Sequence, residues 1–130
     1  MTATPDNLLY TESHEWAKLE DGVATIGITK YAVDQLQDLV FCELNPVGEA
    51  AQAGEGVGVI ESVKIAADIN SPFDGEIIET NSAVEESVDQ ISSDPYGEGW
   101  LVKIKISDPS QADSLLNAEK YKAHCAAEEH

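Results

Sequence analysis

Short apolar runs that alternate with polar residues, each closed within a few positions by a turn former, recur along most of this 130-residue chain. Alternation with a period of two is typical of strands with one buried face. Glycine, proline, asparagine and aspartate between the runs predict tight turns. We therefore expect a mainly β fold, a sandwich or a flattened barrel, with a few short helices. The runs that we interpret as strands are 10–19, 23–28, 39–44, 55–62, 65–69, 75–80 and 100–106.

Turn and cap residues define several of these elements more closely. Asp21-Gly22 separates two strand-like runs, and both residues tolerate the positive φ that a two-residue hairpin needs. Thr29 can cap a short helix over 30–37, because its hydroxyl can accept a backbone N–H of the first turn. The run 39–44 begins with four apolar residues and predicts a buried strand. Further helical segments are expected at 111–116 and at 118–126, the latter capped by Asn117, whereas 84–91 stays ambiguous.

The charge of the chain limits its partners. Seven lysines and no arginine stand against 25 acidic residues, which gives a formal net charge of −18 at pH 7. Nucleic-acid binding needs clustered cations that displace phosphate counterions, so we expect no nucleic-acid partner. An anionic membrane surface is disfavoured for the same reason, and no apolar run has membrane-spanning length. The acidic surface serves either solubility or attraction to partners with positive patches, and both readings stay open.

Cysteine and histidine spacing predicts no metal site. Cys42 lies in an apolar run and is expected to be a buried, inert thiol, while Cys125 near the C-terminus is expected to be free. The three histidines (His14, His124 and His130) are scattered and lack the close spacing of zinc ligands.

Lys64 lies between the strand-like runs 55–62 and 65–69, at the tip of a predicted hairpin. A lysine at such a tip holds its amine in water, where a modifying enzyme can reach it. Lysine is common on protein surfaces, so position alone does not establish this role. The turn formers that set this hairpin apart are Gly54, Gly56 and Gly58 before it and Ser71-Pro72 and Asp74-Gly75 after it.

The segment Glu61-Ser62-Val63-Lys64, followed by small residues and Asp68, resembles the lipoylation segment of the glycine cleavage H-protein family. The resemblance continues, in the family's order and spacing, from about residue 8 to residue 124. Its other segments are Ser13-His14-Glu15-Trp16, 25–29, Val40-Phe41, Glu43-Leu44, Ser71-Pro72, Gly75-Glu76, 94–100, Leu115-Leu116 and Tyr121.

The resemblance implies a fold and a function. The fold is a hybrid barrel-sandwich of two antiparallel sheets with short helices, including a C-terminal helix. Lipoate is joined by an amide to Lys64, on a protein that is a mobile co-substrate and not an enzyme. The lipoyl arm accepts the aminomethyl group of glycine from the P protein, a pyridoxal-phosphate decarboxylase. It presents this group to the T protein, an aminomethyltransferase, and is reoxidised by the L protein, a dihydrolipoyl dehydrogenase.

The resemblance also assigns residues around Lys64. Glu61 is the expected recognition residue for a lipoate ligase or a lipoyl/octanoyl transferase, and the alternative is that Glu61 and Asp68 are ordinary solvated acids. Val63 and Ile65 are expected to anchor the turn to the sheets while Lys64 points away.

A second group of residues is assigned to a cleft that stores the loaded arm. The family's cleft residues match Ser13, Glu15 and Asp68, and a carboxylate there can hold a cationic amine by a charge-assisted hydrogen bond. The alternative is that Glu15 is a surface acid beside a buried Trp16.

The chain departs from the usual family pattern at two positions. Ile65 stands where the family usually has alanine, and Ala67 where serine is more typical. The bulkier Ile65 either alters the fit to the ligase or packs more tightly under the turn.

Other carriers fit less well. Lipoyl domains of 2-oxo-acid dehydrogenases usually show Asp-Lys-Ala at the site and belong to longer chains with linkers. Biotin carriers place methionines beside the lysine, whereas this chain has Val63 and Ile65 there. An H-like lipoyl donor or relay protein remains an alternative. We expect one lipoyl-carrier domain over 1–130, with its core at about 8–124, that acts as a monomer. The N-terminus lacks signal- and transit-peptide features, which favours a bacterial cytosol, or the mitochondrial matrix for a mature eukaryotic form.

Overall fold

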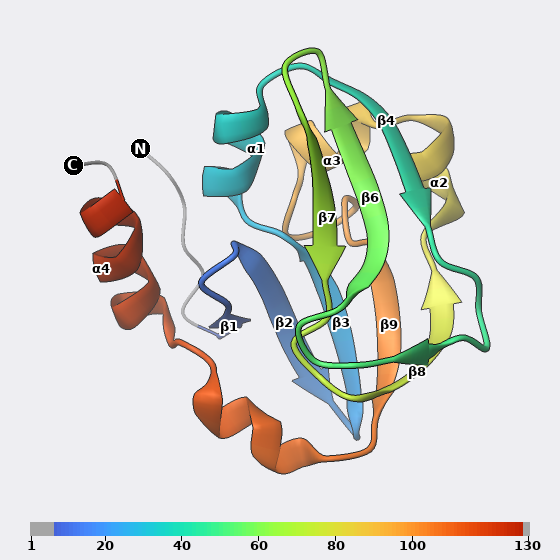
Figure 1. The fold of residues 1–130 in the computed structure, drawn as a ribbon, viewed down its shortest axis with the longest axis vertical. Coiled ribbons are helices and arrows are strands. Elements are labelled where there is room, and N and C mark those ends of the chain that lie inside the picture. Colours follow the sequence, from blue (N-terminus) through green and yellow to red (C-terminus); the bar gives the residue numbers. More distant parts are fainter. Residues whose placement is uncertain (1–6, 129–130) are drawn as a thin grey trace.

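Two antiparallel sheets face each other in the computed structural model, which describes residues 7–128 (Figure 1). Within these residues the larger sheet has six strands and the smaller has three, as the predicted mainly β class requires. In spatial order the larger sheet contains β1 (Leu9–Tyr10), β2 (Glu15–Glu20), β3 (Val23–Ile28), β9 (Val102–Ile106), β8 (Gly75–Thr80) and β5 (Ala50–Ala51). The smaller sheet contains β4 (Leu39–Leu44), β6 (Gly56–Ser62) and β7 (Ala66–Asn70).

The hairpin predicted at Asp21-Gly22 is confirmed. These residues connect β2 to β3 and have φ values of 51° and 79°, so the turn uses the left-handed conformation that aspartate and glycine tolerate. The pairing of Glu20 with Val23 closes the ladder directly at the turn.

The single strand expected over 10–19 is wrong, because a turn divides it into β1 and β2. The N–H of His14 donates to the carbonyl of Thr11, and the N–H of Thr11 donates to the carbonyl of Glu15. His14 has a φ of 75°, which reverses the chain so that β1 pairs with β2. The strand expected over 100–106 likewise begins only at Val102.

The helices follow the predicted caps. The N–H of Ala32 donates to the hydroxyl of Thr29 at the start of α1 (Lys30–Leu36). The N–H of Lys120 donates to the side-chain oxygen of Asn117 at the start of α4 (Ala118–Glu128). The ambiguous segment 84–91 contributes to two short helices, and the helix expected at 111–116 is a 3₁₀ turn placed earlier. Within residues 7–128 no helix is long and apolar enough to cross a membrane. The helices are α1 (Lys30–Leu36), α2 (Ser82–Glu86), α3 (Asp89–Ser93) and α4 (Ala118–Glu128), with the 3₁₀ turn at Pro109–Ser114.

The prediction of a wholly buried strand over 39–44 is wrong for part of β4. Val40 and Phe41 are exposed, since the register of β4 against β6 shifts between Leu39 and Phe41. This irregularity turns two successive side chains outward, whereas a regular strand alternates. Cys42 still faces the core, which confirms that its thiol is buried as predicted, and burial raises the pKa of this thiol to about 12.

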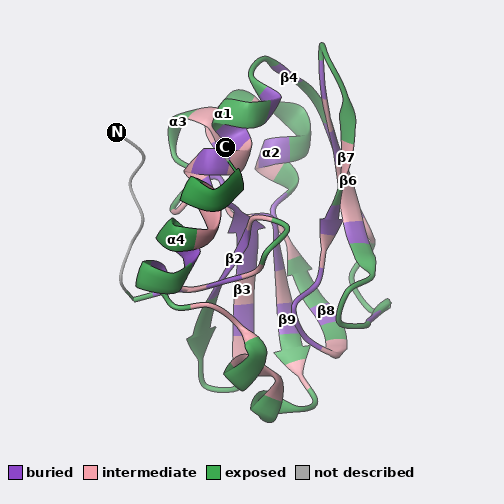
Figure 2. Ribbon diagram, turned by 60° about the vertical axis from the view of Figure 1, so that its left-hand side comes forward, coloured by how far each residue is buried: buried purple, intermediate pink, exposed green. Residues whose placement is uncertain are grey.

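The main core lies between the two sheets, where Figure 2 shows the buried positions concentrated. A second buried cluster joins the N-terminal strands to α4. Tyr10 and Tyr121 stack there with ring centroids 4.6 Å apart, and Trp16 packs in the same cluster. The C-terminal helix is therefore packed on the rest of the fold and not a loose appendage.

Candidate functional site

Lys64 lies at the tip of the hairpin between β6 and β7, at the end of the molecule where α1 also lies (Figure 1). Its side chain is exposed, as are those of its two neighbours. The structure thus confirms the predicted position of this lysine on a hairpin turn.

Ser62 holds this turn in shape, a role that the sequence alone did not indicate. Its hydroxyl oxygen accepts the N–H of Lys64 at 3.2 Å and the N–H of Ile65 at 3.1 Å. The backbone N–H of Ser62 donates to the carbonyl of Ile65 at 2.8 Å. Serine's tendency to bond nearby backbone groups was the available signal. A second brace comes from outside the hairpin, since the N–H of Val63 donates to the carbonyl of Asp38 at 3.0 Å.

The expected anchoring of the turn by Val63 and Ile65 is wrong. Their exposed fractions are 66% and 54%, because the tip projects past the elements that could cover it. Ile65 accordingly does not pack under the turn. With Val40 and Phe41 on the neighbouring strand, these residues form what we call the apolar collar of Lys64. Exposed apolar side chains gathered in one place are typical of a contact surface.

Replacing Ser62 with alanine is expected to loosen the tip while the rest of the fold persists. The turn loses the acceptor of two N–H groups, at a cost of about 1 kcal/mol in the free energy of unfolding. Hydrogen exchange at the amides of residues 63–65 should accelerate. The exposed Ser87 supplies the control, and similar exchange in the Ser62→Ala and Ser87→Ala proteins would contradict the bracing role.

The three predicted cleft residues, Ser13, Glu15 and Asp68, line one hollow of about 150 Å³. This cleft lies where β2 and β3 of the larger sheet approach β6 and β7 of the smaller one, beside α1. Its walls are largely apolar and include Ile28, Leu36, Ile60 and Ala67. Pockets that enclose a whole drug-sized ligand usually measure about 300–1,000 Å³, so this cleft fits the end of an arm better than its full length.

Glu15 is a buried carboxyl group, so the alternative of a surface acid is wrong. Its exposed fraction is 2%. The hydroxyls of Thr11 and Ser13 donate to Oε1 at 2.6 and 2.5 Å, and the N–H of Asn70 donates to Oε2 at 3.2 Å. Since Asn70 belongs to β7, this carboxyl group ties the two sheets together at the cleft. Burial raises the pKa of Glu15 from its ordinary value of 4.5, and the donated hydrogen bonds oppose that rise.

This raised pKa predicts that the difference in stability between the parent and a Glu15→Gln variant depends on pH. Below pH 4.5 the carboxyl group is neutral in both the folded and the unfolded parent. In that range the free energies of unfolding of the parent and the variant should differ by a constant amount. As the pH rises past 4.5, the unfolded parent loses its proton before the folded parent does, and the parent loses stability. As the pH rises from about 4 to about 7, the melting temperature of the variant should therefore increase relative to that of the parent. Parallel curves would contradict the buried, raised-pKa carboxyl group.

The remaining predicted residues flank these two features. Glu61 is half-buried on β6, opposite Ala66 on β7 and Phe41 on β4. Asp68 is exposed on β7, four residues beyond Lys64. The structure thus groups Glu61, Val63 and Ile65 at the tip and Ser13, Glu15 and Asp68 at the cleft, and β7 connects the two groups.

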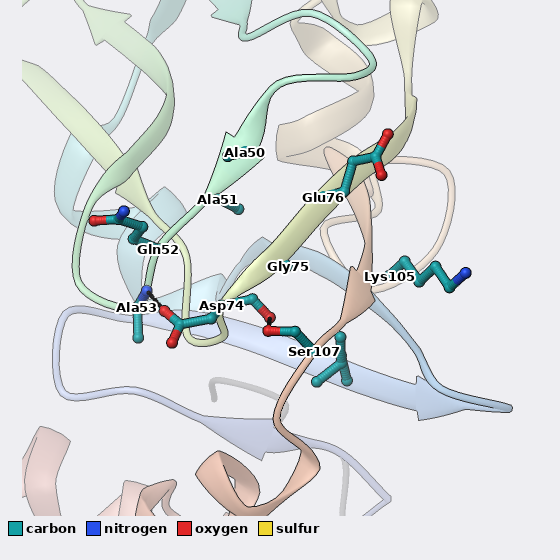
Figure 3. Close-up of a pocket in the computed structure, with 10 residues that line it drawn as sticks. Ala50, Ala51, Gln52, Ala53, Asp74, Gly75, Glu76, Lys105 and Ser107 are labelled. Carbon is teal, nitrogen blue, oxygen red and sulfur yellow. Dashed lines mark hydrogen bonds between the residues drawn. The ribbon is translucent and has the colours of Figure 1, made fainter.

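A larger hollow than the cleft lies elsewhere. It measures about 660 Å³ and is lined by residues 50–53, 74–76 and 105–107 (Figure 3). The start of β8 and the end of β9, which contribute to it, lie at the opposite end of the molecule from the β6–β7 hairpin (Figure 1). Asp74 there accepts hydrogen bonds from the N–H of Ala53 and from the side chain of Gln111. These bonds tie the end of β5 and the 3₁₀ turn to the start of β8, so we interpret the hollow as a structural feature.

Comparison with known proteins gives one consistent result. The family model described as Glycine cleavage H-protein matches residues 8–128. The glycine cleavage system H protein of Alcanivorax borkumensis is 48% identical over 128 residues, covering 98% of this chain and 100% of that protein. The corresponding protein of Bacteroides thetaiotaomicron is 51% identical over 119 residues, covering 92% of this chain and 94% of that protein.

The fold is similar as well. A crystal structure of a glycine cleavage system H protein from Mycobacterium marinum has a TM-score of 0.87 and 38% sequence identity. The match covers 94% of this chain and 98% of that one. The family match over residues 8–128 includes Lys64 and the three cleft residues.

Proposed function

The chain belongs to the glycine cleavage H-protein family, and we propose that it is the lipoyl-carrying shuttle protein of the glycine cleavage system, with Lys64 as the attachment site. In this role it accepts the aminomethyl group of glycine from the P protein, presents it to the T protein and is reoxidised by the L protein. It acts as a co-substrate of these enzymes and not as an enzyme itself. The observation that carries the assignment is an exposed lysine on a braced hairpin within a family match over residues 8–128.

The residues at the tip fit a covalently attached lipoate. The amine of Lys64 is exposed for amide formation, which would also remove its charge. When attached, lipoate supplies a disulfide that opens and closes reversibly by thiolate exchange. The Ser62 bonds keep the base of the arm in a fixed position, so the motion is confined to the arm.

The apolar collar and the cleft provide a contact surface for partner enzymes and a storage site for the loaded arm. Val40, Phe41, Val63 and Ile65 offer partner enzymes an apolar surface around the lysine. The net charge of −18 favours encounter with partners that have positive patches. Between encounters, the apolar walls of the cleft would limit water access to the loaded arm, and Asp68 and the hydroxyl of Ser13 would contact its cationic amine.

The same role implies an attaching enzyme, an oligomeric state and a cellular location for this chain. The attaching enzyme is a lipoate ligase or a lipoyl/octanoyl transferase, and the chain works as one monomeric carrier domain. Its relatives from bacteria favour the bacterial cytosol over the mitochondrial matrix as its place of action.

Reconstitution tests this function. The lipoylated chain, mixed with purified P, T and L proteins, tetrahydrofolate, glycine and NAD, is expected to support NADH formation that requires each component. A lipoylated chain that yields no NADH, but passes its lipoyl group to a 2-oxo-acid dehydrogenase when a transferase is added, would contradict the shuttle role and identify a relay protein.

Glu61 is proposed as the recognition residue for the attaching enzyme. Replacing it with alanine is expected to slow lipoylation of Lys64 at least about tenfold, a loss of about 1.4 kcal/mol of transition-state binding. The melting temperature should change little, since Glu61 is only half-buried. Glu43→Ala, an exposed acid on the adjacent strand β4, is the matched control. Equal initial rates for the Glu61→Ala and Glu43→Ala proteins would exclude the recognition role.

A further inference from the structure

Three potential metal ligands meet where α4 covers the turn between β1 and β2. Nε2 of His14, on this turn, lies 2.7 Å from Oε2 of Glu128 on α4. Nε2 of His124, one helical turn before Glu128, lies 3.1 Å from the same oxygen. All three ligand atoms lie within 4.8 Å of one another. The sequence did not indicate this cluster, because His14 and His124 are far apart in the chain and only the packing of α4 joins them.

The surroundings of His14 orient it for ligation. Its Nδ1 lies 2.8 Å from the hydroxyl of Tyr121, and that hydroxyl lies 2.6 Å from Oγ1 of Thr29. When a metal ion replaces the proton that Nε2 shares with Oε2 of Glu128, Nδ1–H can donate to Tyr121 and Tyr121 to Thr29, which leaves the lone pair of Nε2 for the metal. A hydrogen bond at the other ring nitrogen is the usual outer support of a metal-bound histidine. The ring is also held against Tyr31, with centroids 4.6 Å apart.

We propose that His14, His124 and Glu128 bind a divalent transition-metal ion of the zinc class. Two imidazoles and one carboxylate form the donor set of open zinc sites, in which water supplies the fourth ligand. The side chains of His14, His124 and Glu128 are 15%, 25% and 42% exposed, so ion and water can reach them from solvent.

The required adjustment is small. Zinc bonds of about 2.0–2.1 Å place tetrahedral ligand atoms about 3.3 Å apart. Oε2 of Glu128 lies 2.7 and 3.1 Å from the two histidine nitrogens, and those nitrogens lie within 4.8 Å of each other. His124 would exchange the bond between its Nε2 and the carbonyl of Glu12, now 2.9 Å, for the metal.

Bound metal would fasten α4 to the turn that carries Ser13 and Glu15. These two residues form one wall of the cleft, so the ion would hold that wall in place. The site would act on the carrier's shape and not on the lipoyl chemistry.

The test is zinc titration of the full, untagged and unlipoylated chain by calorimetry, under reducing conditions after treatment with a chelator. We expect one zinc ion per chain, and at least about tenfold weaker binding for His124→Gln and for Glu128→Gln. Glu119→Gln, an exposed acid in the first turn of α4, is the matched control and should bind as the parent does. His130→Asn tests the remaining histidine, which lies outside the described residues, and should also bind as the parent does.

A second measurement links the ion to the fold. Zinc should slow hydrogen exchange in the turn 11–15 and at 124–128 in the parent, and should not do so in His124→Gln. The proposal is overturned if the parent shows no saturable binding up to about 100 μM zinc, or if all four variants bind with equal affinity. Because lipoate is absent from the titration, failure here leaves the carrier function untouched.

Discussion

Replacing Lys64 with arginine is expected to abolish NADH formation in the reconstituted glycine cleavage system while the protein stays folded. A guanidinium group keeps the charge and length of the side chain but does not form the lipoyl amide. Since Lys64 is exposed, its replacement should change the free energy of unfolding by less than about 0.5 kcal/mol. Activity and melting temperature, measured on the same preparations, separate the loss of the attachment site from a loss of structure.

Lys105→Arg is the matched control for this prediction. Lys105 is also exposed, but it lies on β9, where it lines the separate hollow beside Gly75 and Glu76 (Figure 3). The Lys105→Arg protein should support NADH formation at the parent rate. Glycine-dependent activity that survives in Lys64→Arg would show that the arm is attached elsewhere.

Replacing Gly75 with alanine is expected to destabilise the fold severely, although it adds only one methyl group. A Cβ atom at Gly75 would lie 2.0 Å from the carbonyl oxygen of Lys105 and 2.9 Å from Cγ2 of Ile104. Gly75 sits between β5 and β9, opposite both Ala51 and Ile106, so the clash involves backbone that cannot move alone. We expect a loss of about 3 kcal/mol in the free energy of unfolding and a fall in melting temperature of about 10 °C.

Gly56 offers a control on another strand. A Cβ atom there would have its nearest neighbours at 4.0 Å, which is ordinary contact. The Gly56→Ala protein should therefore melt within a few degrees of the parent. If the two alanine variants melted at the same temperature, close backbone approach at Gly75 would not be the reason for glycine at this position.

Local signals in the sequence predicted much of the fold. Asp21-Gly22 and the caps Thr29 and Asn117 act on residues a few positions away, so their effects can be read without knowing the rest of the structure. The strand predicted over 75–80 and the position of Lys64 between two strands were correct for the same reason.

Features that depend on distant contacts were not predictable in this way. Strand alternation alone could not show that nothing covers Val63 and Ile65, since burial depends on the elements packed nearby. The division of 10–19 into two strands follows from the left-handed backbone of His14, a conformation with no reliable signal for histidine. Family resemblance indicated Glu15, but its bond to Asn70 and its burial required the two sheets to be placed together.

Attachment of lipoate to Lys64 can be measured directly as the mass of the intact chain before and after incubation with lipoate, ATP and a lipoate ligase, followed by peptide mapping. We expect a single lipoyl increment, located on the peptide that contains Lys64 and absent from Lys64→Arg. A folded chain that gains no increment, or gains it at another lysine, would contradict the assignment of Lys64 as the attachment site of the carrier arm.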